Sequence, residues 1–118
     1  MSSPFGDYLR ERREARRLED PTFSLRQLAL RIGVEPSYLS KVERGIEAPP
    51  SEPRIAALAT ELGEDPDVLL ALAGKVSSEL QEVIRKRPRL MGELLRELKT
   101  LPDHAVLRIA REVRDGNW

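Results

Sequence analysis

The sequence predicts an all-α protein, and three observations support this fold class. Apolar residues recur every three or four positions along most of the chain, which is the spacing of one helix face. Aromatic residues make up only 4% of the sequence and hydrophobic residues 40%, which favours a core of aliphatic side chains. Serine, glycine and proline stand where helices of ordinary length would begin and end.

The first predicted helix covers residues 5–17 and ends before Pro21. Its expected apolar stripe consists of Phe5, Tyr8, Leu9 and Ala15. Its remaining arginines, with glutamates interleaved, are interpreted as a solvent-exposed face made by Arg10, Arg12, Arg16 and Arg17.

Two short helices are predicted next, on either side of Gly33. Ser24 followed by Gln27 has the spacing of a capping box and begins the first of them. Gly33 supplies the positive φ that a tight helix exit needs. Pro36 opens the second helix, where its missing N–H costs nothing, and this helix ends near Gly45.

Two further helices complete a first region of five, residues 1–74. Ser51 is expected to cap a helix that runs to Leu62. The following helix, residues 67–73, is stopped by Gly74.

Residues 75–118 form a second region of about three helices. Ser78 and Gln81 repeat the capping-box spacing. Pro88 ends that helix and opens another, and Pro102 opens the last one.

The composition excludes several classes of protein. The chain has no cysteine, so it can form neither a disulfide framework nor a thiolate metal site. It has neither the apolar stretch of a signal peptide nor a run of about 18 apolar residues, and we expect a cytoplasmic protein. His104 is the only histidine, and no P-loop or Ser–His–Asp arrangement is present. We therefore expect no metal, no cofactor and no enzymatic activity.

The stretch 24–45 has the geometry of a helix-turn-helix unit. Its second helix places Ser37, Lys41 and Arg44 on one face, at the spacing i, i+4 and i+7. That face is polar and basic, and it is available to a partner. The residues expected to point inward are Leu28, Ala29, Ile32, Leu39 and Val42.

Two segments, "SLRQLALRIGVEPSYLSKVERG" and "PPSEPRIAALATELGEDPDVLLALAG", resemble the Cro/CI-type (XRE) helix-turn-helix regulators over roughly residues 5–74. The elements LA, GV, SYLS and ERG, followed by IAALATELG, occur in that family's order and spacing. The resemblance implies a five-helix lambda-repressor-like DNA-binding domain, followed by the C-terminal helical segment.

The resemblance also implies how the domain would meet double-stranded DNA. In this family the third helix enters the major groove, so Pro36, Ser37 and Lys41 are expected at base edges. Lys41 is the best candidate for reading a base, because lysine can donate to guanine O6 and N7. Arg13 and Glu43 are expected to form a structural ion pair. The expected contacts with the DNA backbone are Ser24, Arg26, Tyr38, Ser40, Arg44 and Arg54.

Three features depart from the family pattern. The family usually has glutamine at the first position of its second helix, where this chain has Leu25, and Arg26 is the expected substitute. The link "RLEDPTF", residues 17–23, is longer than the family often has. Glu47 stands in the loop after the third helix, where basic residues often reach a phosphate, and Arg54 is the nearest replacement.

The charge distribution is unfavourable for a strong DNA binder. Residues 1–74 carry 10 lysines and arginines against 13 acidic residues, a net charge of −3. Residues 24–45 are locally basic, while acids gather in "ELGEDPD". We therefore expect weak non-specific affinity and a dependence on dimerisation.

Two functions stay open at this point. The leading one is a sequence-specific DNA-binding transcriptional regulator, a dimeric repressor that reads a palindromic operator. The alternative is an antitoxin or adaptor that binds a partner protein through residues 75–118, with DNA binding secondary. The resemblance further implies that a partner protein or protease could inactivate such a repressor. The expected homodimer or partner contacts are Leu90, Met91, Leu94, Leu95, Leu98, Val106, Ile109, Val113 and Trp118.

Overall fold

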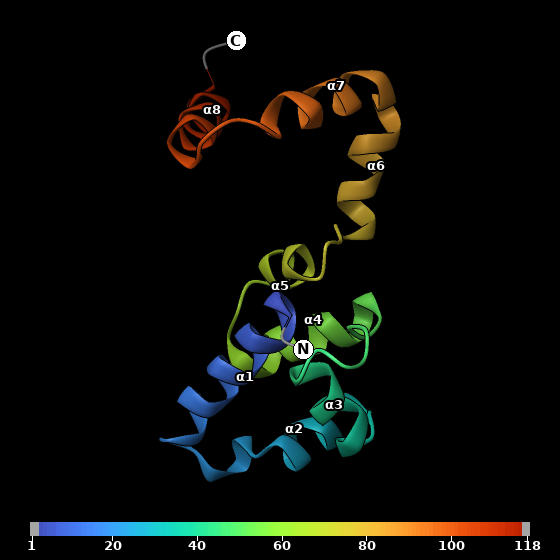
Figure 1. Cartoon of the computed structure of the whole chain (residues 1–118), viewed down its shortest axis with the longest axis vertical. Coiled ribbons are helices and arrows are strands. Elements are labelled where there is room, and N and C mark those ends of the chain that lie inside the picture. Colours follow the sequence, from blue (N-terminus) through green and yellow to red (C-terminus); the bar gives the residue numbers. More distant parts are fainter. Residues whose placement is uncertain (1–2, 117–118) are drawn as a thin grey trace. The chain divides into compact units, whose positions relative to one another are not determined.

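The computed structural model describes residues 3–116, and within that range it contains helices and no strand (Figure 1). The all-α fold class is confirmed. The chain divides into two compact units, of which the first ends at Ser77 and the second begins at Ser78. The division expected after Gly74 thus falls in the loop that leads to the second unit.

The first unit contains five α-helices and one short 3-10 helix among its described residues. In chain order these are α1 (Pro4–Arg17), η1 (Pro21–Phe23), α2 (Leu25–Ile32), α3 (Pro36–Glu43), α4 (Glu52–Leu62) and α5 (Pro66–Leu72). The described part of the second unit contains α6 (Ser78–Lys86), α7 (Pro88–Leu98) and α8 (Asp103–Asp115).

The turn between α2 and α3 has the geometry that the sequence predicts. Gly33 follows α2 with a φ of 76°, in the left-handed region that favours glycine. At the start of α2, the Ser24 hydroxyl oxygen accepts the Gln27 N–H at 3.3 Å and donates to Gln27 Oε1 at 3.0 Å. Pro36 is the first residue of α3, so its missing N–H removes no helical hydrogen bond.

Two predicted caps differ in the structure. Ser51 precedes α4, but its side chain makes no capping hydrogen bond. The second residue of α4 is Pro53, which lacks one of the N–H groups that a capping side chain binds. Ser78 is the first residue of α6, so it lies inside the helix and not before it.

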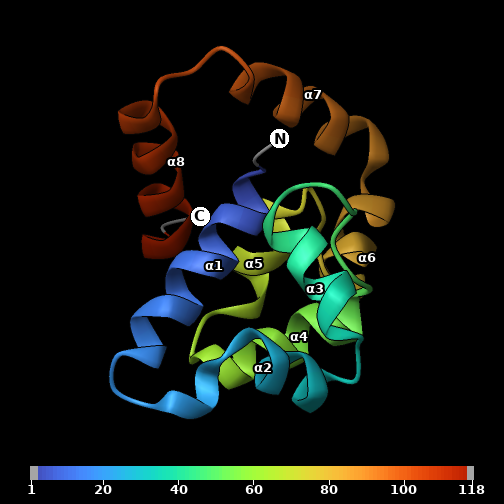
Figure 2. The same ribbon diagram turned by 60° about the horizontal axis from the view of Figure 1, so that its bottom comes forward.

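The core of the first unit is built from aliphatic side chains and two phenylalanines. α1 packs against α3, α4 and α5, and α2 packs against α3 and α4 (Figure 2). All the residues predicted to point inward from the helix-turn-helix stretch are buried. The buried apolar residues are Phe5, Leu9, Phe23, Leu28, Ala29, Ile32, Leu39, Val42, Ile55, Leu58, Ala59, Leu62, Leu69 and Leu70.

The buried stripe of α1 differs from the predicted one at its end. Ala15 is exposed, and Arg13 is buried in its place. Arg13 follows Leu9 by four residues and so lies on the same side of the helix, whereas Ala15 lies on another side. A charged residue thus occupies a core position, which an apolar pattern alone does not predict.

The long link between α1 and α2 is packed around Phe23, which is buried. The guanidinium carbons of Arg16 and Arg31 each lie 4.8 Å from the centre of the Phe23 ring. Arg31 also donates to the Thr22 carbonyl at 2.6 Å and forms an ion pair with Glu61 at 3.5 Å. Cation–π contacts from two helices therefore hold the link in place.

η1 forms inside this link. The Asp20 carboxylate accepts the Thr22 N–H at 2.9 Å and the Thr22 hydroxyl at 2.7 Å. These hydrogen bonds lower the pKa of Asp20. The sequence signals only a break here, because a single 3-10 turn is too short to show periodicity.

The second unit has no buried side chain in its described part, residues 78–116. α6 and α7 pack against each other, yet much apolar surface stays open to solvent. Of the expected dimer or partner contacts, Met91 and Leu98 are half-buried, and Trp118 lies outside the described residues. The large apolar side chains that are exposed are Leu80, Val83, Leu90, Leu94, Leu95, Leu101, Val106, Leu107, Ile109 and Val113.

Gly6 marks a close approach between α1 and the end of α3. A Cβ atom at Gly6 would overlap the carbonyl oxygen of Val42 and lie 2.8 Å from that of Glu43. Both obstacles are backbone atoms, so they cannot move aside as a flexible side chain can. Gly92 in α7 differs, because a Cβ there meets nothing within 4 Å outside its own helix.

We expect Gly6→Ala to lower the free energy of unfolding by about 1–3 kcal/mol, the usual cost of overpacking a close contact. Gly92→Ala is the matched control and should be neutral or stabilising by up to about 1 kcal/mol, because alanine favours a helix. Urea unfolding followed by circular dichroism measures both variants. Equal stability of Gly6→Ala and the wild type would contradict the close approach.

Candidate nucleic-acid interface

α3 presents one polar face to solvent and buries the other. Ser37, Lys41 and Arg44 are all exposed. On the opposite side, Leu39 and Val42 have exposed fractions of 0% and 1%. The three polar residues that share a face by their spacing therefore lie on the outer surface of the first unit.

The side chain of Arg44 is held close to α3. Arg44 follows α3 directly, and its Nε donates to the Ser40 carbonyl at 3.3 Å. This bond leaves the terminal nitrogens of Arg44 free to donate elsewhere. Ser40 and Pro36 are half-buried beside the exposed face.

A buried ion pair fixes the end of α3 on α1. Arg13 Nε lies 2.8 Å from Glu43 Oε2, and its second terminal nitrogen lies 2.9 Å from Glu43 Oε1. Both residues have an exposed fraction of 5%. The hydrogen bonds to Glu43 raise the pKa of Arg13. The two-point geometry sets both the position and the rotation of α3.

Arg13 also reaches two neighbours outside α3. It donates to the Phe23 carbonyl at 3.5 Å and to Glu14 Oε1 at 3.2 Å. The same guanidinium thus joins α1, the link and α3.

The Tyr38 hydroxyl donates its proton to the Ala48 carbonyl at 2.9 Å. The DNA-backbone contact that the resemblance implies for Tyr38 stays a prediction. Burial, and secondly the charge of Glu47, raise the pKa of Tyr38. In this structure Tyr38 holds the loop after α3 against that helix.

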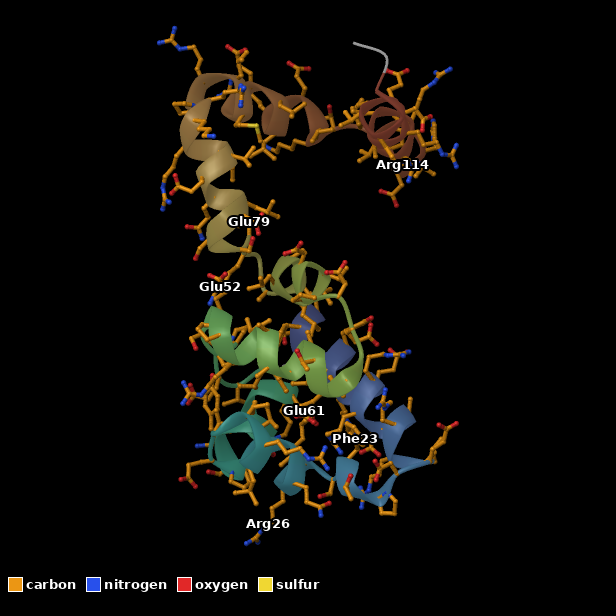
Figure 3. The ribbon with its side chains drawn as sticks, turned by 180° about the vertical axis from the view of Figure 1, so that it is seen from behind. Phe23, Arg26, Glu52, Glu61, Glu79 and Arg114 are labelled. Carbon is orange, nitrogen blue, oxygen red and sulfur yellow. The ribbon has the colours of Figure 1, made fainter. Side chains whose placement is uncertain are left out.

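The remaining expected backbone contacts lie at three places around α3. Arg26 is exposed on α2, and Figure 3 shows its side chain pointing away from the unit. Arg54 is exposed on α4, but it donates to the Gly33 carbonyl at 3.2 Å and so supports the turn before α3. The hydroxyl of Ser24 is used by Gln27, which leaves only main-chain groups at the start of α2 for a phosphate.

Residues 3–116 contain neither a candidate metal site nor a candidate membrane-spanning helix. No group of three or more His, Cys, Asp and Glu side chains is arranged to hold a metal ion there. None of the helices in that range combines the length and the hydropathy needed to cross a bilayer. His104 is exposed in the first turn of α8.

A comparison with protein families decides the identity of the first unit. A helix-turn-helix domain family matches residues 4–72, which is more than half of the chain. The chain belongs to the helix-turn-helix family. This confirms the resemblance drawn from the sequence, and the match covers α1 to α5, including the exposed face of α3.

The chain is also similar to a curated protein whose name includes the helix-turn-helix type. The chain is 36% identical over 81 residues to an uncharacterized HTH-type transcriptional regulator, RghRB, of Bacillus subtilis (strain 168). The aligned part covers 69% of this chain and 55% of the relative, so the chain spans about half of that protein's length. No solved structure gives a significant match.

We expect Arg13→Met to destabilise the first unit by about 3–5 kcal/mol, because it leaves the Glu43 carboxylate buried without its partner. Replacing both residues, as in Arg13→Met with Glu43→Leu, should recover most of that loss, since no buried charge then remains. Chemical unfolding of the two single variants and the double variant measures the coupling. Additive losses in the double variant would show that the pair does not act as a unit.

Proposed function

We propose that the chain is a sequence-specific DNA-binding transcriptional regulator, a dimeric repressor that places α3 in the major groove of a palindromic operator. One observation carries this proposal: the polar and basic face of α3 is exposed while a buried ion pair holds the helix in position. The family match and the regulator named among its relatives support it.

Some residues of this face would contact bases, and others would contact phosphates. Ser37 and Lys41 lie in the middle of the exposed face, where base edges would come within reach, and Pro36 opens the helix beside them. Lys41 can donate to guanine. Phosphate contacts would come from the residues around the helix, namely Ser40, Arg44, Arg26, Arg54 and the main chain at Ser24.

We propose that a second copy of the chain packs against the apolar surface of the second unit. A palindromic operator offers two half-sites about one helical turn apart, so two domains must be held together. The exposed apolar side chains of α6, α7 and α8 give a surface suited to that purpose. No side chain in residues 78–116 is buried without such a cover.

A second candidate function is an antitoxin or adaptor that binds another protein through the second unit. The same apolar surface favours it, together with the net charge of −3 over residues 1–74. Selection of bound duplexes from a random pool separates the two candidates. A recovered palindrome supports the repressor, whereas the absence of any selectable sequence supports the antitoxin or adaptor.

We expect Lys41→Ala to weaken binding to the selected duplex by about 1–3 kcal/mol and to relax the preference at one base position. Lys99→Ala is the matched control, because it removes the same charge after α7, outside the helix-turn-helix unit. Fluorescence anisotropy at fixed salt measures both variants. Unchanged affinity and unchanged base preference in Lys41→Ala would rule out base reading by this residue.

We expect Leu94→Glu in α7 to convert a dimer into a monomer, because it places a charge in the apolar surface of the second unit. Its helix content should fall little, since Leu94 is 44% exposed in the single chain. Leu18→Glu is the control, because Leu18 is 90% exposed and lies in the first unit. Sedimentation velocity measures the assembly. A wild-type monomer at DNA-binding concentrations would remove the dimer from the proposal.

A further inference from the structure

A polar hollow lies beside the exposed face of α3. It has a volume of about 260 Å³ and is bordered by Arg10 of α1, Leu25 of α2 and Arg44 at the end of α3. Ser40 also lines it, so two of its residues belong to the surface that carries Ser37 and Lys41. A ligand in this hollow would lie next to whatever α3 contacts.

Both carboxylates of the hollow accept hydrogen bonds from Arg13, and its three arginines exceed the two carboxylates by one positive charge. Its two carboxylates belong to Glu14 and Glu43. Arg13 donates to both of them, twice to Glu43 and once to Glu14 at 3.2 Å. The nitrogens of Arg13 all donate within the protein, whereas the terminal nitrogens of Arg10 and Arg44 form no bond within the described residues.

Arg10 differs from the other arginines of its helix. Arg12 forms an ion pair with Glu64, and Arg16 stacks on Phe23 and donates to the Leu62 carbonyl. Arg10 and Arg17 are exposed and form no ion pair within the described chain. Only Arg10 of these two borders the hollow, so its position, and not merely its charge, distinguishes it from a solvated arginine.

The guanidinium groups of Arg10 and Arg44 suit a phosphate. Arg44 uses Nε on the Ser40 carbonyl and keeps its terminal nitrogens, while Arg10 keeps all its donors. A guanidinium group presents paired N–H donors that match phosphate oxygens. Leu25 is packed against the core and offers no side-chain donor from α2, so the arginines would supply the contacts.

We propose that Arg10 and Arg44 together bind one backbone phosphate of duplex DNA in this hollow. The inference rests on the proposed function, because the phosphate belongs to the strand that borders the groove occupied by α3. It assigns a DNA contact to α1, whose arginines the sequence pattern places on a solvated face. The contact would fix the angle of α3 in the groove without reading any base.

The first test compares Arg10→Ala with Arg17→Ala across a salt series, on a selected duplex and on a random one. Arg10→Ala should weaken binding to both duplexes by the same factor, roughly 10-fold. It should also reduce the slope of log affinity against log salt by about 1. Arg17→Ala should match the wild type. An unchanged salt slope, or a loss limited to the selected duplex, would overturn the assignment.

A second measurement locates the phosphate. Single phosphates of the selected duplex are replaced in turn by neutral methylphosphonates. At one position in each half-site, the replacement should weaken wild-type binding yet have no further effect on Arg10→Ala. Arg10→Lys should restore the salt slope but only part of the affinity, because lysine keeps the charge and loses the paired donors. Additive losses at every position would reject the contact.

These outcomes separate the inference from the proposed function. If Lys41→Ala loses selectivity while Arg10→Ala binds like the wild type, only the phosphate assignment fails. If the wild type binds no duplex at all, both fail.

Discussion

The buried pair between Arg13 and Glu43 is the interaction on which the arrangement of the first unit depends. Two buried charges are expensive to remove from water, and they are tolerated only when their geometry is good and their remaining donors are satisfied. Here Arg13 makes two bonds to Glu43 and further bonds to the link and to Glu14. An apolar pair could fill the same space but would not fix the rotation of α3 so sharply. The orientation of the exposed face follows from that rotation.

The close contact at Gly6 complements this pair. Glu43 is held by its side chain, while the carbonyl oxygens of Val42 and Glu43 lie against Gly6. One end of α3 is therefore held on α1 through both side-chain and main-chain atoms. The start of α3 is held differently, through the Gly33 turn that Arg54 supports and the Tyr38 bond to the loop. α3 is thus fixed at both ends, and its outer face stays clear.

Much of this architecture could be predicted from the sequence, because helix ends depend on local chemistry. Serine, glycine and proline mark the ends of α2 and the start of α3, and the spacing of Leu28, Ile32, Leu39 and Val42 marks their buried sides. What could not be predicted depends on contacts distant in the sequence. The donor role of Tyr38 and the hollow beside Arg10 both arise from segments that meet in space. No pattern along a single helix contains that information.

The open apolar surface of α6, α7 and α8 has a thermodynamic consequence. A segment with no buried side chain gains little hydrophobic stabilisation by itself, while fixing its backbone costs conformational entropy. Any molecule that covers the segment stabilises it by mass action, in proportion to the logarithm of its concentration. The concentration of the molecule that binds this surface would then set the folded fraction of the segment.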